Sequence, residues 1–123
     1  MTPQELRDRS WEFSRRTRRF CVPLFRHVEH QHAANQLRRA ALSAAANYRA
    51  VCIARTPRNF VAKLDIVVEE ADEADFWATD LDDAGLKSEE LTWIIREARE
   101  LTRIFHHDGP SSRAGGAVEP RLQ

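Results

Sequence analysis

One stretch decides the fold: Leu37-Arg38-Arg39-Ala40-Ala41-Leu42-Ser43-Ala44-Ala45-Ala46-Asn47-Tyr48-Arg49-Ala50-Val51-Cys52-Ile53-Ala54-Arg55. Its apolar residues recur at alternating spacings of four and three, a pattern typical of a helix packed along another helix. They are Leu37, Ala41, Ala44, Tyr48 and Val51, with Ala40, Ala45 and Cys52 beside them. Because alanine projects little beyond the backbone, the stretch predicts a helix over 37–55 that a neighbouring helix approaches closely.

The middle of this helix carries polar residues that we interpret as part of a helix-packing motif. The motif consists of Ser43, Ala46, Asn47 and Tyr48. Ser43 and Asn47 lie one turn apart and can offer hydrogen bonds across the seam between two helices. The motif indicates architecture rather than an active site.

Three more amphipathic segments surround this one, each with its own start signal. Thr2-Pro3-Gln4-Glu5 predicts a capping box with proline at the first helical position, and Pro23 ends or kinks that first helix. Thr56-Pro57 starts a third helix that Gly85 stops, and Ser88 caps a fourth. The predicted buried stripes of these three helices are Leu6, Ser10, Phe13, Thr17, Phe20 and Leu24; Phe60, Leu64, Val67, Ala71, Ala74, Ala78 and Leu81; and Leu91, Ile94, Ile95, Ala98, Leu101, Ile104 and Phe105.

Four helices with short connections predict an all-α fold, an antiparallel up-down-up-down four-helix bundle. We expect one domain over residues 1–108, because 123 residues can bury a real core but are short for two domains. The connection between the first two helices is the polar segment His27 to His32. Residues 109–123 are rich in Gly, Ser, Pro and Arg without periodicity, so we expect a disordered C-terminal tail.

Composition places the chain among cytoplasmic proteins. No apolar run of about 18 residues is present to span a bilayer, and the charged N-terminus does not fit a signal peptide. We therefore expect no membrane partner. Cys21 and Cys52 both fall on apolar helical stripes, which favours two reduced core thiols over a disulfide framework.

The net charge is zero, but the charges are segregated along the chain. Residues 1–58 hold 12 Lys and Arg against 4 Asp and Glu, a net charge of +8, and residues 59–123 hold 7 against 15, a net charge of −8. Such complementarity can hold helices in register, or match the basic face of one subunit to the acidic face of the next. Solvated helix faces that happen to differ in sign are the alternative.

Three sequence segments together point to a known family. They are Ser43-Ala44-Ala45-Ala46-Asn47-Tyr48-Arg49-Ala50, Arg55-Thr56-Pro57-Arg58-Asn59-Phe60-Val61-Ala62-Lys63-Leu64 and Glu69-Glu70-Ala71-Asp72-Glu73-Ala74-Asp75-Phe76-Trp77. Through them the chain resembles the bacterial four-helix bundle proteins of the 23S ribosomal RNA intervening-sequence protein family, over most of residues 5 to 105. In that family a glycine usually occupies the position of Ala45, so the closest helix approach here must accommodate one more methyl group.

The resemblance implies an antiparallel bundle that assembles into a ring-shaped homopentamer. The family is named for members encoded within intervening sequences of large-subunit ribosomal RNA genes. Related bundles are accessory subunits of the reverse transcriptase of diversity-generating retroelements, where a basic surface contacts nucleic acid. No biochemical activity is established for most members. The arginine-rich first helix varies among them, and the tail lies outside the resemblance.

Catalytic and metal-binding chemistry find little support in the sequence. Glu29 and His32 form one Glu-x-x-His, whereas a carboxylate-bridged metal pair needs two such motifs facing each other in the core. His106 and His107 belong to the opposite end of an up-down bundle, so loop histidines in solvent are the simpler interpretation. We predict no catalytic residue, no metal ligand and no cofactor.

The third predicted helix carries an acidic face, which we name the acidic partner face: Glu69, Glu70, Asp72, Glu73 and Asp75. No nearby nucleophile, motif histidine or glycine-rich loop would tune these carboxylates for acid–base catalysis. We expect the face to pair with arginines of the first or second helix, within or between subunits. A plain solvated face is the alternative.

Arginines are the sign of a nucleic-acid partner, because they bind phosphates bidentately and release counterions. The candidates for nucleic-acid or subunit contact are Arg15, Arg16, Arg18, Arg19, Arg38, Arg39, Arg49, Arg55 and Arg58. Zero net charge and the lack of a recognition motif weigh against nucleic acid. We assign Trp11, Phe76, Trp77 and Trp93 to the core or to subunit contact.

The leading hypothesis is therefore a non-catalytic, homo-oligomeric bundle, with a pentamer preferred, that serves as an interaction or scaffold module. The alternative is an accessory protein that binds RNA or DNA beside an RNA-processing or reverse-transcribing enzyme.

Overall fold

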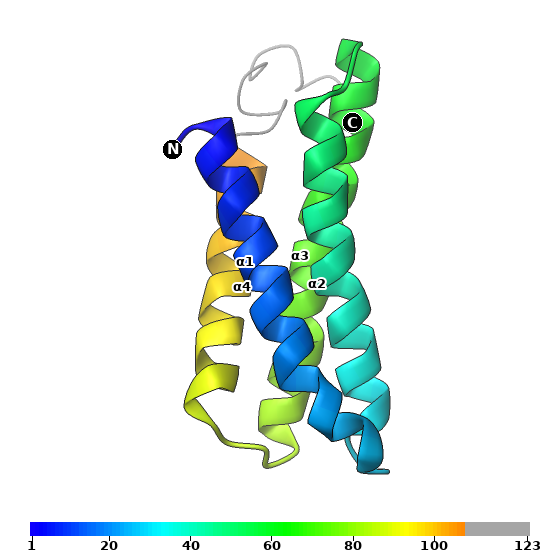
Figure 1. Cartoon of the computed structure of the whole chain (residues 1–123), viewed down its shortest axis with the longest axis vertical. Coiled ribbons are helices and arrows are strands. Elements are labelled where there is room, and N and C mark those ends of the chain that lie inside the picture. The colour runs from blue at the N-terminus through cyan, green and yellow to red at the C-terminus, as the bar shows by residue number, and fades with distance from the viewer. Residues whose placement is uncertain (108–123) are drawn as a thin grey trace, which may run out of the picture.

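Helices make up most of residues 1–107, the part of the chain that the computed structural model describes. They are α1 (Pro3–Cys21), the short 3₁₀ helix η1 (Val22–Arg26), α2 (Gln31–Cys52), α3 (Pro57–Asp83) and α4 (Glu89–His107). Figure 1 shows α1 to α4 running alternately down and up the long axis. Helix α2 packs against α1 and α3, and α4 packs against α3 and α1, so α1 and α3 lie diagonally. The all-α, up-down-up-down four-helix bundle is confirmed.

The predicted capping box sets the start of α1. The Glu5 amide donates a hydrogen bond to Thr2 Oγ1 at 3.0 Å, and the Thr2 amide donates to Glu5 Oε1 at 2.8 Å. Two of the amides that a helix N-terminus leaves without intrahelical partners are satisfied in this way at the first turn. At the other end α1 stops at Cys21, and the chain tightens into η1 around Pro23.

The other helix ends follow the same local chemistry. Thr56 accepts a hydrogen bond from the Asn59 amide at 3.1 Å, and Ser88 accepts one from the Leu91 amide at 3.0 Å. Gly85 has φ 102°, the left-handed conformation that glycine adopts without a steric penalty. Helix α2 begins at Gln31, inside the predicted polar connection, and ends at Cys52 rather than at Arg55.

Small side chains line the contact between α2 and α3, the most extensive helix pair of the bundle. Ala41 and Ala44 on α2, and Ala71, Ala74 and Ala78 on α3, are all at most 2 % exposed. Larger side chains close the core around them: Phe13, Leu37, Val67, Leu81, Leu91, Ile94, Leu101 and Phe105. The predicted seam is therefore present. Ala45 is 4 % exposed, so the bundle accommodates its methyl group.

Two sequence-based expectations need correction. Cys21 is buried as predicted, but Cys52 is exposed, because it is the last residue of α2 and lies on a cavity at the end of the bundle where α1 only begins. Asn47 Nδ2 donates to the Ser43 carbonyl at 2.9 Å and to Ser43 Oγ at 3.1 Å. These bonds lie within α2, where residues four apart face each other, and they do not cross the seam.

Candidate functional site

Two arginines of α1 hold α4 in register. Arg9 Nε and a terminal nitrogen donate to the two carboxylate oxygens of Glu97 at 2.7 and 2.9 Å. Arg16 binds Glu90 in the same bidentate way, at 2.9 and 2.7 Å. The arginines are seven residues apart on α1, and the glutamates are seven apart in the opposite direction on α4. Equal spacing on two helices expected to be antiparallel is the sequence signal that could have predicted both pairs.

Arg16 is further held by an aromatic ring. Its guanidinium carbon lies 3.5 Å from the centroid of the Trp93 ring, which in turn contacts Phe13 with ring centroids 6.3 Å apart. Hydrogen bonds from Arg16 are the main cause that lowers the pKa of Glu90 below its ordinary value. Arg16 therefore stabilises the α1–α4 contact and is poorly placed to bind an external phosphate.

The other candidate arginines fall into two groups. Arg15, Arg38 and Arg39 each donate to a side chain one turn earlier on their own helix. In the second group the side chain makes no hydrogen bond or ion pair with any residue of the 1–107 region: Arg18, Arg19, Arg49, Arg55 and Arg58. All five side chains are exposed. This group provides cations that have no acceptor side chain within the described residues.

The acidic partner face lies along the outside of α3. Glu69, Asp72 and Glu73 are exposed, while Glu70 and Asp75 are half-buried. Asp75 accepts hydrogen bonds from Arg99 Nε of α4 at 3.1 Å, so the ion pair that this face forms within residues 1–107 is with α4. The expectation that arginines of the first or second helix pair with it inside the subunit is not met by any described ion pair.

Partial burial and repulsion from neighbouring carboxylates raise the pKa of Glu70. Desolvation is the larger cause that raises the pKa of Glu70, and the neighbouring Glu73 adds to it, while Arg39 of α2 opposes the shift. Arg39 therefore attracts Glu70 across the α2–α3 contact, although no ion pair joins the two side chains among the described residues. The face as a whole keeps uncompensated negative charge.

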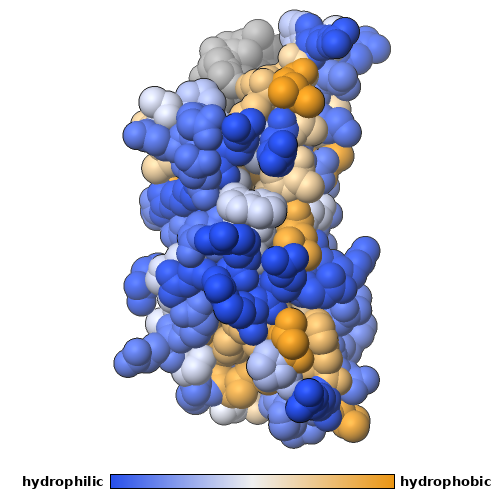
Figure 2. Space-filling model, viewed as in Figure 1, coloured by the Kyte–Doolittle hydropathy of each residue, from blue (hydrophilic) through white to orange (hydrophobic). Residues whose placement is uncertain are grey.

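Large apolar side chains are exposed on both charged regions. Trp11 on α1 is 49 % exposed and Phe76 on α3 is 60 % exposed. Neither ring therefore lies in the core, and we keep subunit contact as the proposal for both. Figure 2 shows a mainly hydrophilic face on which apolar side chains appear in separate small patches. Trp77, by contrast, is half-buried and contacts Phe76 and His32.

Histidines do not converge in the described part of the chain. The His27 and His30 rings have centroids 6.4 Å apart at one end of the bundle, and the His106 and His107 rings are 6.2 Å apart at the other. Among residues 1–107 there is no cluster of three or more His, Cys, Asp or Glu side chains arranged to hold a metal ion.

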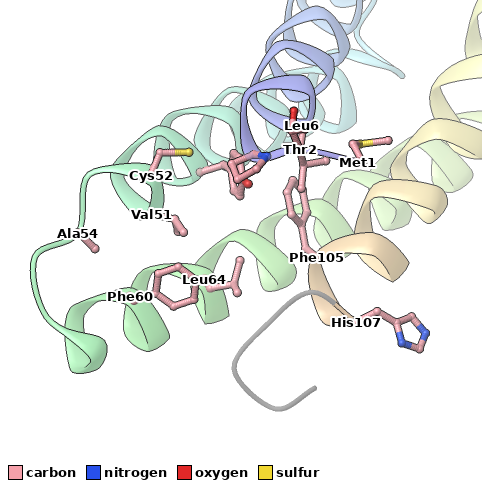
Figure 3. Close-up of a pocket in the computed structure, with 12 residues that line it drawn as sticks. Met1, Thr2, Leu6, Val51, Cys52, Ala54, Phe60, Leu64, Phe105 and His107 are labelled. Carbon is pink, nitrogen blue, oxygen red and sulfur yellow. The ribbon is translucent and has the colours of Figure 1, made fainter. Parts of the chain in front are cut away.

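A cavity of about 610 Å³ lies at the end of the bundle where α1 begins and α4 ends. Its walls are mainly apolar, with Leu6, Val51, Leu64 and Phe105 among them. Figure 3 shows the His107 imidazole directed away from these side chains. Thr2, Tyr48 and Cys52 also line the cavity, and no Asp or Glu is among the described residues that line it. The predicted tail, residues 109–123, lies outside the described residues.

None of the described helices combines the length and the apolar character needed to cross a bilayer.

Comparison with known proteins supports the fold. No protein-family model and no curated protein matches the chain. Among solved structures, it is similar to a protein of unknown function from the S23 ribosomal protein family of Bacteroides thetaiotaomicron VPI-5482. The two share 24 % sequence identity with a TM-score of 0.77, over 85 % of this chain and 95 % of that one. This likeness shows a shared four-helix fold, in agreement with the resemblance found in the sequence.

Proposed function

We propose that the protein is a non-catalytic, homo-oligomeric four-helix bundle that works as an interaction or scaffold module in the cytoplasm. One observation carries the proposal: a single bundle bears an exposed arginine-rich surface on α1 and α2 and an exposed acidic surface on α3. Opposite potentials on different faces favour association of identical copies in a head-to-tail manner, which gives a ring when the rotation between copies closes. The resemblance favours five subunits in that ring.

The assembly state tests this function directly. Sedimentation or light scattering of the purified chain at micromolar concentration should give an oligomer at low salt. Since charge complementarity contributes to association, raising the salt from about 0.05 to 0.5 M should shift the population toward smaller species. A monomer at low salt would refute the scaffold proposal, and an oligomer that ignores salt would refute its electrostatic part.

A second candidate function is binding of RNA or DNA as an accessory protein beside a nucleic-acid-processing enzyme. The exposed arginines of α1, α2, the α2–α3 loop and the start of α3 that lack an ion pair within residues 1–107 favour it. Each phosphate that such an arginine neutralises releases counterions and makes affinity fall with salt.

Filter binding to structured RNA and duplex DNA over a salt series tests this second function. Combined replacement of Arg18→Gln and Arg19→Gln should reduce the slope of log affinity against log salt by about two. The control is Arg96→Gln on α4, which removes an exposed arginine that lies beside Thr79 and Asp82 of α3. Absence of retention at low salt would exclude nucleic-acid binding.

A further inference from the structure

One side of α1, continued by the first residue of η1, carries arginines and large apolar side chains. Its members are Arg7, Trp11, Arg15, Arg18 and Val22, spaced four, four, three and four residues apart, so they follow one side of the helix. Arg7 is half-buried, and the other four are exposed. Trp11 is 49 % exposed and Val22 53 % exposed. Beside Trp11, a hollow of about 130 Å³ is lined by Arg7 and Asp8 of α1 and by Ala45 and Arg49 of α2. We name this side the tryptophan stripe.

A second stripe with the opposite charge runs along α3. Its members are Asp65, Glu69, Asp72, Phe76, Asp80 and Asp83, spaced four, three, four, four and three residues apart, and all six are exposed. Phe76 is its one apolar residue and is 60 % exposed. A concave region of about 460 Å³ lies beside Phe76, lined by Asp72, Asp80 and Arg99 among others. We name this side the phenylalanine stripe.

The two stripes match in register. Arginines stand four residues before, four after and seven after Trp11, while carboxylates stand four before, four after and seven after Phe76. A carboxylate, Glu69, also stands seven before Phe76. If the two rings meet, each arginine therefore faces a carboxylate whether the helices run parallel or antiparallel.

The stripes cannot meet within one chain, because α1 and α3 are diagonal in the bundle and both stripes face outward. A contact between them must join two copies, and it uses a different surface on each copy. Such a heterologous contact repeats from subunit to subunit and gives a ring or a chain.

We infer that the tryptophan stripe of α1 docks onto the phenylalanine stripe of α3 in a second copy of this chain, with Trp11 and Phe76 at the centre of the interface. The inference rests on the proposed homo-oligomer and names its contact surface. Aromatic side chains surrounded by charged residues are the usual energetic centre of protein interfaces, and the surrounding charges select partner and register.

Truncation of the two rings is the first test. Trp11→Ala and Phe76→Ala should each raise the dissociation constant for self-association by about tenfold or more, measured by sedimentation at low salt. Both rings are exposed in the single subunit, so circular dichroism and the melting temperature of the dissociated variants should show an intact bundle. The matched control is Ile53→Ala, because Ile53 is 75 % exposed but lies outside both stripes.

Charge reversal and rescue form the second test. Arg18→Glu should weaken association by a similar factor, since it places a carboxylate opposite a carboxylate. Adding Asp83→Arg restores association if the paired helices are parallel, and adding Glu69→Arg restores it if they are antiparallel. The control reversal, Arg96→Glu on α4, should leave association unchanged.

The possible results distinguish a wrong interface from a wrong function. A wild-type oligomer that survives both ring truncations, or an Arg18→Glu variant that neither second reversal rescues, overturns the interface and leaves the scaffold proposal standing. A wild-type chain that is monomeric at low salt overturns both. Loss on ring truncation together with rescue by one of the two reversals supports the assignment.

Discussion

Thr17 places a hydroxyl in the core of the bundle. The residue is fully buried on α1, and its Oγ1 has no hydrogen-bond partner among the described residues. The neighbouring buried hydroxyls of Ser10 and Ser14 differ, since each donates to the backbone carbonyl three residues earlier. Burying an unsatisfied hydroxyl costs free energy that an apolar group of the same shape avoids.

Thr17→Val should therefore raise the free energy of unfolding by about 1 kcal/mol. Valine keeps the branched shape and removes the hydroxyl. The measurement is urea denaturation followed by circular dichroism. Ser14→Ala is the control, because it removes a hydroxyl that is hydrogen-bonded to the Trp11 carbonyl at 2.8 Å, and it should be neutral or destabilising. A destabilised Thr17→Val variant would show that the buried hydroxyl does not cost stability.

The two cysteines show what a single residue's position decides. Burial raises the pKa of the Cys21 thiol to about 12, so that side chain is kept from reacting as a thiolate in the folded protein. Cys52 is exposed at the end of α2. The periodicity of the sequence places both cysteines on apolar stripes. It does not predict where a helix extends beyond the neighbouring helix that would bury its stripe.

At the scale of elements, the contact between α1 and α4 depends on the Arg16–Glu90 pair. Arg16→Gln should lower the free energy of unfolding at neutral pH by about 1 kcal/mol, from loss of the bidentate ion pair and the stacking on Trp93. Arg15→Gln is the matched control, because Arg15 pairs with Glu12 one turn away on the same exposed helix surface. Its effect should be a few tenths of a kcal/mol at most.

The pH dependence of that loss follows from the direction of the pKa shift. The pKa of Glu90 is lowered in the folded protein, so its stabilising contribution is complete above the ordinary carboxyl pKa and disappears as the pH falls through the folded value. The difference between wild type and Arg16→Gln should shrink in acid, leaving only the Trp93 stacking. A difference that stays constant from neutral pH to about pH 3 would refute the role of Glu90.

The alanine seam between α2 and α3 limits how large its side chains can be. Ala41 is fully buried there, so Ala41→Leu should lower the free energy of unfolding by about 1 to 3 kcal/mol through overpacking. Ala46, which the sequence assigned to the helix-packing motif, lies instead on the exposed side of the same helix. Ala46→Leu should therefore change stability by less than about 0.5 kcal/mol. Equal effects from the two substitutions, measured by thermal or urea denaturation, would contradict close packing at the seam.

At the scale of the whole molecule, the four helix contacts are unequal. Helices α2 and α3 share the most extensive contact, while α1 and α4 share the least extensive of the adjacent pairs and rely on two ion pairs there. We expect native-state hydrogen exchange to show the strongest amide protection in the middle of α2 and α3 and weaker protection in α4. Protection in α4 that exceeds that of α2 would show that stability is distributed differently.

Local signals in the sequence determined the bundle because each acts within a few residues. The capping box at Thr2 and Glu5, the glycine at position 85 and the three-four spacing of apolar residues all fix an element without reference to the rest of the chain. The segregation of charge was also visible in the sequence as two halves of opposite sign.

Only the tertiary structure decided which charges are already used and which are free for a partner. It pairs Arg9 and Arg16 with α4, joins Asp75 to Arg99, and leaves Trp11 and Phe76 exposed on diagonal helices. These pairings depend on residues distant in the sequence and on which helix covers which face. Helical periodicity gives the faces of each helix, whereas the packing of four helices selects the face that remains in water.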